Sequence, residues 1–220
     1  MDSAYLAMVT PLLIKSAGWT ISLFCLTLIL SIPLGLPFAL GENSRIFPVK
    51  AICRVYVFIF RGTPLLLQLM FFYYLFPLGF NVQIAAMPAA VLTFVLNYAA
   101  YFAEIYRGGI ASIDQGQYEA AYSLGLSRTR TLFGIIIPQA MRVVLPPMSN
   151  EAINLVKDTA LASVITLPEI MRTADGMVSR DGKMVSYVVA ALIYLAFTAV
   201  VTLALSKFED RFGRYGKKEA

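Results

Sequence analysis

The chain has 220 residues, of which 59% are hydrophobic and only 14% are charged. Ordinary soluble domains carry about a quarter charged residues, so this composition excludes a water-soluble protein and predicts an integral membrane protein. The absence of histidine, with two cysteines that lie in or beside apolar segments, excludes zinc and imidazole chemistry. The net charge of +5 comes from basic residues in short loops, which indicates membrane orientation rather than nucleic-acid binding.

Apolar segments recur along the chain, each near the roughly 20 residues that a helix needs to cross the hydrocarbon core. We expect membrane crossings at about 17–40, 54–76, 87–106, 131–156 and 184–206. The second segment is interrupted at Arg61-Gly62-Thr63-Pro64, and prolines break the fourth. A charged, irregular stretch at 157–183 precedes the last segment. The predicted fold is an all-α membrane protein of five transmembrane helices, with residues 1–220 forming a single transmembrane domain.

Basic residues divide unequally between the two sides of such a bundle, because five crossings place the termini on opposite sides. The poorer side holds Lys15, Lys157, Arg172, Arg180 and Lys183. The richer side holds Arg45, Lys50, Arg54, Arg107, Arg128, Arg130, Lys207, Arg211, Arg214, Lys217 and Lys218. The positive-inside rule therefore predicts an outer N-terminus and a cytoplasmic C-terminus.

The polar loop at about 107–130 carries helix signals. Asp114 is a candidate N-cap, Gln117 can complete a capping box, and Gly125 suits a left-handed helix end. These residues predict a short helix near 115–124, and Ser127 predicts the cap of the next helix. Physical reasoning alone leaves an ordinary connecting loop as the alternative.

The spacing in this loop resembles the EAA signature of the membrane subunits of bacterial ABC importers. Its elements are Glu119-Ala120-Ala121, Gly125 and Ile135-Ile136-Ile137-Pro138, with isoleucine at 137 in place of the usual leucine. Further segments resemble the polar amino-acid permease branch of that family. They are Arg61–Gln68, Asn97–Glu104, Arg107-Gly108-Gly109 and Asn154–Thr159.

The resemblance implies the permease subunit of an importer for polar amino acids in the bacterial inner membrane. Its implied partners are a second permease, identical or homologous, two cytoplasmic ATPase subunits, an extracytoplasmic amino-acid-binding protein and membrane lipid, with no nucleic acid. The chain itself is expected to be no enzyme and to hold no cofactor, because it lacks a phosphate-binding loop and the ATPase subunits would bind ATP and Mg. The implied ATPase-coupling residues are Tyr118, Glu119, Ala120, Ala121, Ser123, Leu124 and Gly125.

A polar stripe in the fourth segment predicts the substrate pathway. Asn150, Glu151, Asn154, Lys157 and Asp158 share one helical face, and ionisable groups at membrane depth usually face a cavity or one another. An outer helix end at the lipid headgroups is the alternative. Carboxylates together with an amine suit a zwitterionic amino acid, and the resemblance favours that interpretation. The predicted pathway residues are Arg61, Thr63, Gln68, Asn97, Glu151, Asn154, Lys157, Asp158 and Thr159.

Some of the residues in these segments can also be explained by helix packing or ion pairing. Arg61 fits a broken helix that lines the pathway, or equally a snorkelling arginine beside a packing kink. Glu104 is expected to pair with Arg107, and the small residues Ala99, Ala100 and Ala103 predict close helix packing.

Two other functional classes fit the sequence less well than an importer permease does. The first is an ion-coupled secondary amino-acid transporter with Glu104, Glu151 and Asp158 as ion sites, although the chain shows no internal repeat. The second is a membrane-embedded enzyme that uses carboxylates, for which the sequence supports no paired acid and base.

Overall fold

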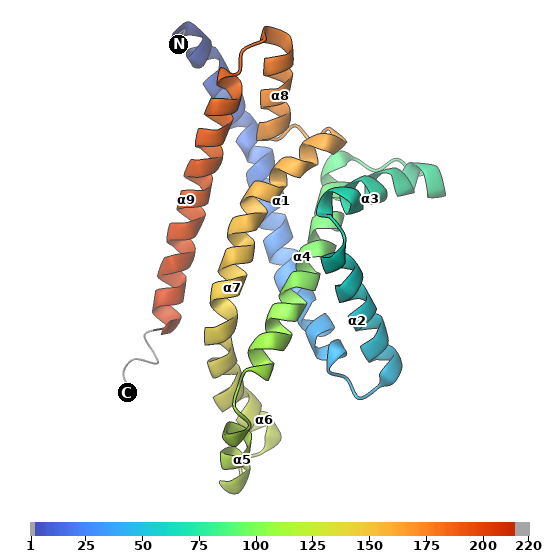
Figure 1. Ribbon diagram of the computed structural model, residues 1–220, viewed down its shortest axis with the longest axis vertical. Coiled ribbons are helices and arrows are strands. Elements are labelled where there is room, and N and C mark those ends of the chain that lie inside the picture. Colours follow the sequence, from blue (N-terminus) through green and yellow to red (C-terminus); the bar gives the residue numbers. More distant parts are fainter. Residues whose placement is uncertain (1–2, 214–220) are drawn as a thin grey trace.

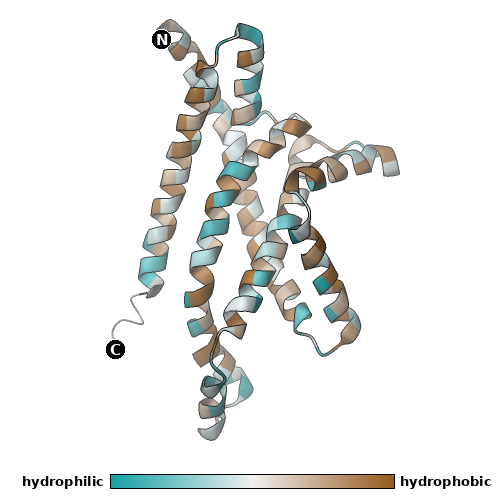
Figure 2. Cartoon of the chain, in the orientation of Figure 1, coloured by the Kyte–Doolittle hydropathy of each residue, from teal (hydrophilic) through white to brown (hydrophobic). Residues whose placement is uncertain are grey.

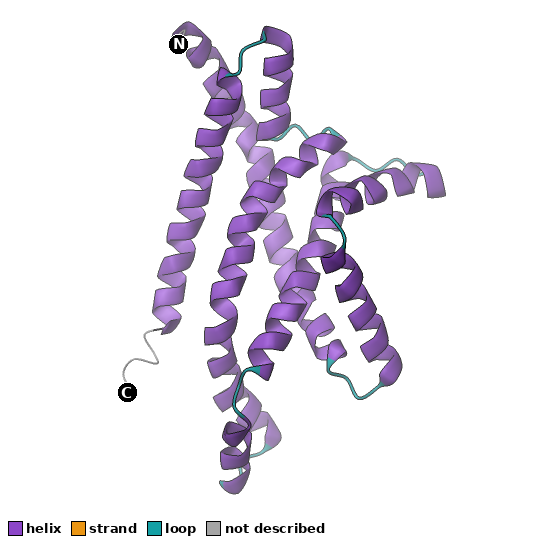
Figure 3. Ribbon diagram, in the orientation of Figure 1, coloured by secondary structure: helices purple, strands orange, loops and turns teal. Residues whose placement is uncertain are grey.

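The computed structural model describes residues 3–213, and every regular element within them is helical (Figures 1 and 3). In chain order these are α1 (Ser3–Glu42), α2 (Phe47–Gly62), α3 (Leu65–Phe80), α4 (Ala86–Ala111), α5 (Gln115–Ser123), α6 (Arg128–Thr131), the π-helix η1 (Leu132–Ile136), α7 (Ile137–Asp158), the 3-10 helix η2 (Thr159–Ile165), α8 (Ile170–Asp181) and α9 (Val185–Gly213). Three residues of the orientation prediction, Arg214, Lys217 and Lys218, lie outside the described residues.

Within the described chain, 4 helical stretches are long and apolar enough to span a membrane. They are Ala4–Glu42, Ala86–Ala111, Arg128–Ile165 and Val185–Arg211. The predicted second crossing differs from these, because α2 and α3 meet at a bend of 109°. In Figure 1, α3 leaves the bundle sideways. Counting this bent pair as one span gives the five crossings that the sequence predicts.

Two predicted interruptions of regular structure are corrected. The fourth segment is not broken at Pro146 and Pro147, because α7 runs through both. The backbone adjusts instead before Pro138, where the N–H of Ile137 bonds to the carbonyl of Leu132 in a π turn. Local π adjustments of this kind re-satisfy backbone groups around a proline. The stretch at 157–183 is likewise not irregular, because it contains η2 and α8.

α4 lies at the centre of the bundle and approaches α1 closely. Ala99, Ala100 and Ala103 are fully buried, which confirms the prediction of close packing. A Cβ atom placed on Gly35 of α1 would lie 2.8 Å from Phe102 Cβ and 3.0 Å from the carbonyl oxygen of Ala99. Glycine is therefore required at 35 for the two backbones to approach this closely.

Replacing Gly35 with valine is expected to destabilise the bundle by about 1–3 kcal/mol, because the added side chain meets backbone atoms of α4 that cannot rotate away. Gly18→Val provides a matched control on the same helix, since a Cβ there would meet no atom within 4 Å beyond the adjoining residues and backbone of its own helix. Thermal denaturation of the purified protein in detergent measures the difference. Equal loss of stability in both variants would contradict close α1–α4 packing.

A buried carboxylate anchors α8 to the bundle. Glu169 has 0% exposure and caps α8, with its Oε1 accepting from the N–H of Arg172 at 2.6 Å. Its Oε2 accepts from the N–H of Met171 at 2.8 Å and from Tyr194 Oη at 2.7 Å. Burial raises the pKa of Glu169, and these hydrogen bonds oppose that rise. The cap holds α8 against α9, at the end of the molecule opposite α5 (Figure 1).

Candidate functional site

A polar cavity of about 670 Å³ lies where the α2–α3 break, α4 and α7 meet. In Figure 2, brown, hydrophobic residues cover much of α9, whereas teal, hydrophilic residues recur along α7. The lining of the cavity comprises Arg61, Gly62, Thr63, Pro64, Leu65, Asn97, Tyr98, Tyr101, Glu151, Asn154, Lys157 and Asp158. The cavity thus combines residues from three parts of the sequence, and it is the candidate translocation pathway.

The stripe on α7 contributes most of the charge. Glu151, Asn154, Lys157 and Asp158 all line the cavity, and α7 is helical through Asp158. The helical periodicity of these residues therefore places them on one face, as expected. Asn150, the remaining member of the stripe, is exposed and lies outside the lining.

Hydrogen bonds and ion pairs fix several of the charged groups. Tyr98 is buried, and its hydroxyl donates to Asp158 Oδ2 at 2.7 Å. Arg61 lines the cavity, pairs with Glu104 at 3.3 Å and lies 5.6 Å from the ring centroid of Tyr101. Glu104 also pairs with Arg107, as predicted. Arg61 thus joins the end of α2 to α4. An arginine that lines the cavity and pairs with another helix fits the interpretation of a broken helix beside the pathway better than that of an arginine snorkelling to the membrane surface.

Two of the predicted pathway residues do not line the cavity. Gln68 is buried in α3, and its Nε2 donates to the carbonyl oxygens of Phe60 at 2.9 Å and Thr63 at 3.1 Å. Thr159 is fully buried in η2, and its Oγ1 donates to the carbonyl of Val156 at 2.6 Å. Both side chains donate hydrogen bonds to nearby backbone carbonyls. A sequence pattern shows that a residue is polar, but it does not show whether that residue bonds to backbone or lines a pathway.

The lining also includes two tyrosines that sequence reasoning missed, Tyr98 and Tyr101 of α4. Both belong to the Asn97–Glu104 segment that carries the family resemblance. The sequence could have predicted that Tyr101 lines the cavity, because Tyr101 lies one helical turn after Asn97 and therefore on the same face of the helix. Tyrosine hydroxyls in an apolar helix normally find a polar partner when buried, as Tyr98 does here.

The predicted helix between α4 and α7 is present as α5. The side chain of Asp114 accepts from the N–H of Gly116 at 2.6 Å, so Asp114 is an N-cap as predicted. Ser127 caps α6 by accepting from the N–H of Arg130. The capping-box role of Gln117 is wrong, because its Oε1 accepts from Gln139 of α7 at 3.1 Å. Gln117 therefore ties α5 to α7.

α5 ends in a Schellman motif centred on Gly125. This glycine has φ +70°, a left-handed conformation that side chains with a Cβ rarely adopt. The N–H of Leu126 bonds to the carbonyl of Ala121 at 3.1 Å, and the N–H of Gly125 bonds to that of Tyr122 at 2.9 Å. The chain therefore reverses immediately after α5 and enters α6.

The predicted coupling residues differ in exposure. Ala121 is buried, whereas the side chain of Leu124 is 78% exposed. Tyr122, which was not among the predicted coupling residues, is 85% exposed. Tyr118, Glu119, Ala120 and Ser123 are also exposed. A groove of about 780 Å³ runs along α5 and α6; its lining includes Tyr118, Tyr122 and Leu132. Exposed aromatic and aliphatic groups on a short projecting helix are typical of a protein-docking surface.

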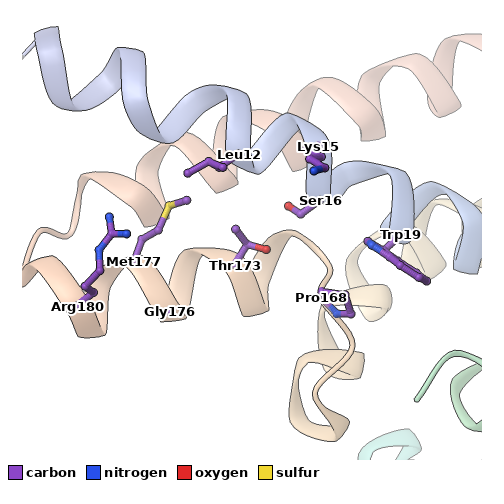
Figure 4. A pocket seen from close by; sticks show the side chains of 9 residues that line it. All are labelled: Leu12, Lys15, Ser16, Trp19, Pro168, Thr173, Gly176, Met177 and Arg180. Atoms are coloured by element: carbon purple, nitrogen blue, oxygen red, sulfur yellow. The ribbon is translucent and has the colours of Figure 1, made fainter. Parts of the chain in front are cut away.

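A different cavity, of about 320 Å³, lies between α1 and α8 (Figure 4). In Figure 4, Leu12 of α1 and Thr173 and Met177 of α8 point into the space between the two helices. Its cationic side chains are Lys15 and Arg180, and its lining contains no carboxylate. A zwitterion needs acceptors as well as donors, so the polar cavity beside α7 is the better candidate.

Apolar helices of spanning length beside a polar cavity define a multi-pass membrane protein with a candidate path for polar solutes. The chain belongs to the family described as binding-protein-dependent transport system inner membrane component, whose model matches residues 31–214. It is thus a permease subunit of an ABC-type importer, and this membership does not favour an ion-coupled secondary transporter.

Named relatives cover nearly the whole chain. The L-cystine transport system permease protein TcyB of Bacillus subtilis is 42% identical over 210 residues, which are 94% of this chain and 89% of the relative. The glutamine transport system permease protein GlnP of Escherichia coli is 35% identical, over 91% of this chain and 93% of the relative. The arginine transport system permease protein ArtQ of Bacillus subtilis is 35% identical, over 87% and 88%.

Solved structures agree with the fold. A crystal structure of an amino acid ABC transporter with histidines matches with a TM-score of 0.88 and 37% identity, over 96% of this chain and 99% of the other. An inward-facing structure of the MetNI methionine ABC transporter matches with a TM-score of 0.73 at 13% identity, over 96% and 99%. The second likeness supports the fold alone.

Proposed function

We propose that this permease subunit conducts a polar amino acid or a close analogue through the cavity between the α2–α3 break, α4 and α7. The observation that carries the proposal is the presence of both charge signs in one cavity. Glu151 and Asp158 can accept hydrogen bonds from an ammonium group, and Lys157 can donate to a carboxylate. The three relatives named above are described as transporting cystine, glutamine and arginine, all of which carry both groups.

We further propose that a second permease, identical or homologous, covers the open side of this cavity. Asn154 and Lys157 are exposed in the single chain. Polar and ionisable groups at membrane depth are costly against lipid and instead face protein or water. A partner that covers this face would complete an aqueous pathway between the two subunits.

The orientation rests on the positive-inside rule. Basic residues at the α5 end are Arg45, Lys50, Arg54, Arg107, Arg128 and Arg130. The N-terminal end of α1 and α8 lie at the opposite end of the bundle (Figure 1). We therefore place the α5 end in the cytoplasm, the N-terminus outside, and the protein in the bacterial cytoplasmic membrane.

Three further kinds of partner follow from this placement. The region at 107–130, which includes α5, would dock on one of two cytoplasmic ATPase subunits, which would bind the ATP and Mg. The exposed Tyr122 and Leu124 supply apolar contact area for helix-in-groove docking. An extracytoplasmic binding protein would deliver the amino acid at the α8 end. Membrane lipid would surround the bundle, and no nucleic acid is involved.

Reconstitution tests this function directly. The chain, its permease partner and the ATPase subunits would be placed in proteoliposomes with the binding protein, and ATP hydrolysis would be measured against a panel of amino acids. We expect stimulation by one class of amino acid together with uptake of the same compound. Stimulation by non-amino-acid solutes alone would move the substrate outside this class, and uptake driven by an ion gradient without ATP would overturn the importer mechanism.

A further inference from the structure

Two buried amide side chains join the broken helix to α4. Gln68 and Asn97 are 8% and 4% exposed. Asn97 Nδ2 donates to Gln68 Oε1 and to the carbonyl oxygen of Phe60, both at 3.0 Å. Gln68 Nε2 donates to the same carbonyl at 2.9 Å. One amide from α3 and one from α4 therefore meet on the last turn of α2.

The break between α2 and α3 leaves carbonyl groups that need these two side chains as hydrogen-bond donors. Pro64 follows the end of α2 and has no N–H, so the last carbonyls of α2 lose the partners that a continuous helix would supply. Thr63 Oγ1 donates to the carbonyl of Ile59 at 2.8 Å, and Gln68 Nε2 contacts that same hydroxyl at 2.8 Å. Non-helical backbone at membrane depth persists only where protein groups or water satisfy it.

We propose that Gln68 and Asn97 form an amide latch that fixes the angle between α2 and α3 and thereby positions Thr63 and Arg61 in the translocation pathway. Gln68 is a positioning residue, because it lies outside the cavity lining and its amide is engaged with Asn97 and with backbone. Asn97 also lines the cavity, but its Nδ2 is engaged with Phe60 and Gln68, so Gln68→Met is the variant that tests positioning without removing a lining residue. The proposal rests on the proposed function, since the cavity must carry the amino acid for the position of Thr63 to affect transport.

Other contacts also join α2 to α4 near the latch. Tyr56 Oη donates to the carbonyl of Leu96 at 2.6 Å, one residue before Asn97. Arg61 pairs with Glu104, which lies seven residues after Asn97, or about two turns further along α4. α4 ends at Ala111, and only a short turn separates it from α5. Movement of α5 would therefore reach the break through α4, with Asn97 as the contact at the bend.

Substitutions that keep shape but remove the amide test the latch in the assembled transporter. The variants are Asn97→Leu and Gln68→Met, singly and together. Thr93→Val is the matched control, because Thr93 is fully buried on α4 and its hydroxyl donates only to the carbonyl of Ala89 in its own helix, at 2.8 Å. Hydrogen exchange of the peptide spanning 60–72 reports the state of the break without any substrate.

We expect each latch variant to speed exchange in this peptide by about tenfold, with no change for Thr93→Val. Among correctly assembled complexes, the amino-acid concentration for half-maximal ATPase stimulation should rise by about tenfold, while the maximal rate stays within about twofold. The double variant should match the worse single variant, because both amides serve one network.

Several results would overturn the latch. Unchanged exchange at 60–72 in both single variants would show that the break is fixed by other contacts. A loss of assembled protein with an unaltered half-maximal concentration would reduce the amides to a structural role, and strictly additive effects would exclude a shared network. If the unaltered complex responds to no amino acid, the proposed function fails, and the exchange measurement still decides whether the latch exists.

Discussion

Replacing Gly125 with valine is expected to lower transport and substrate-stimulated ATP hydrolysis by about tenfold or more while leaving membrane insertion intact. Gly125 occupies a left-handed conformation at φ +70°, and a β-branched residue is strained there regardless of space. The strain would unfold the Schellman turn or tilt α5. Since α5 presents the exposed Tyr122 and Leu124, the surface that we propose docks on the ATPase would lose its fixed angle.

Gly125→Asn separates backbone strain from other effects, because asparagine tolerates the left-handed region far better than valine. This control should retain most of the activity. Co-purification of the ATPase subunits and uptake in proteoliposomes measure both variants, and the amount of protein in the membrane fraction measures insertion. Uptake by the valine variant at the unaltered rate would count against α5 as the coupling element.

Neutralising the two carboxylates of the cavity is the second change with a large expected effect. Asp158→Asn and Glu151→Gln keep the shape of each side chain and remove an acceptor charge from the lining. Hydrogen bonds to charged groups contribute about 1.5–3 kcal/mol, so we expect the concentration for half-maximal ATPase stimulation to rise by about 10- to 100-fold in each variant. The asparagine at 158 can still accept from Tyr98, so the local structure is preserved.

Asn150→Ala supplies the matched control for these two variants. Asn150 belongs to the same α7 stripe but is exposed and lies outside the cavity lining. It should leave the half-maximal concentration unchanged. Wild-type behaviour of both carboxylate variants would make the polar stripe structural, and an equal effect of Asn150→Ala would assign the loss to α7 as a whole rather than to the cavity.

Sequence patterns predicted much of this molecule because they depend on local physics. Apolar runs longer than the membrane thickness identify the spanning helices, and helical periodicity places Glu151, Asn154 and Asp158 on one face of α7. The caps at Asp114 and Ser127 and the left-handed Gly125 are likewise readable, since each depends on a few neighbouring residues.

Prolines showed the limit of that local reasoning. Pro146 and Pro147 suggested a break, yet α7 continues through them. The Thr63-Pro64 step also contains a proline, and here the helix turns by 109°. At Pro64, side chains from α3 and α4 take part: Gln68 and Asn97 both donate to the carbonyl of Phe60, which proline leaves without its helical N–H partner. Local sequence does not reveal which prolines have such partners.

The amino-acid sequence by itself determined the all-helical membrane class, the short α5 helix and the polar face of α7, because each follows from composition, periodicity or capping within one segment. Only the tertiary structure decided which polar groups share a cavity. It brought Tyr98 to Asp158 across 60 positions of sequence, and it assigned Gln68 to the backbone rather than to the pathway. A side chain's polarity predicts that it needs a partner, whereas packing of the helices determines which partner lies within reach.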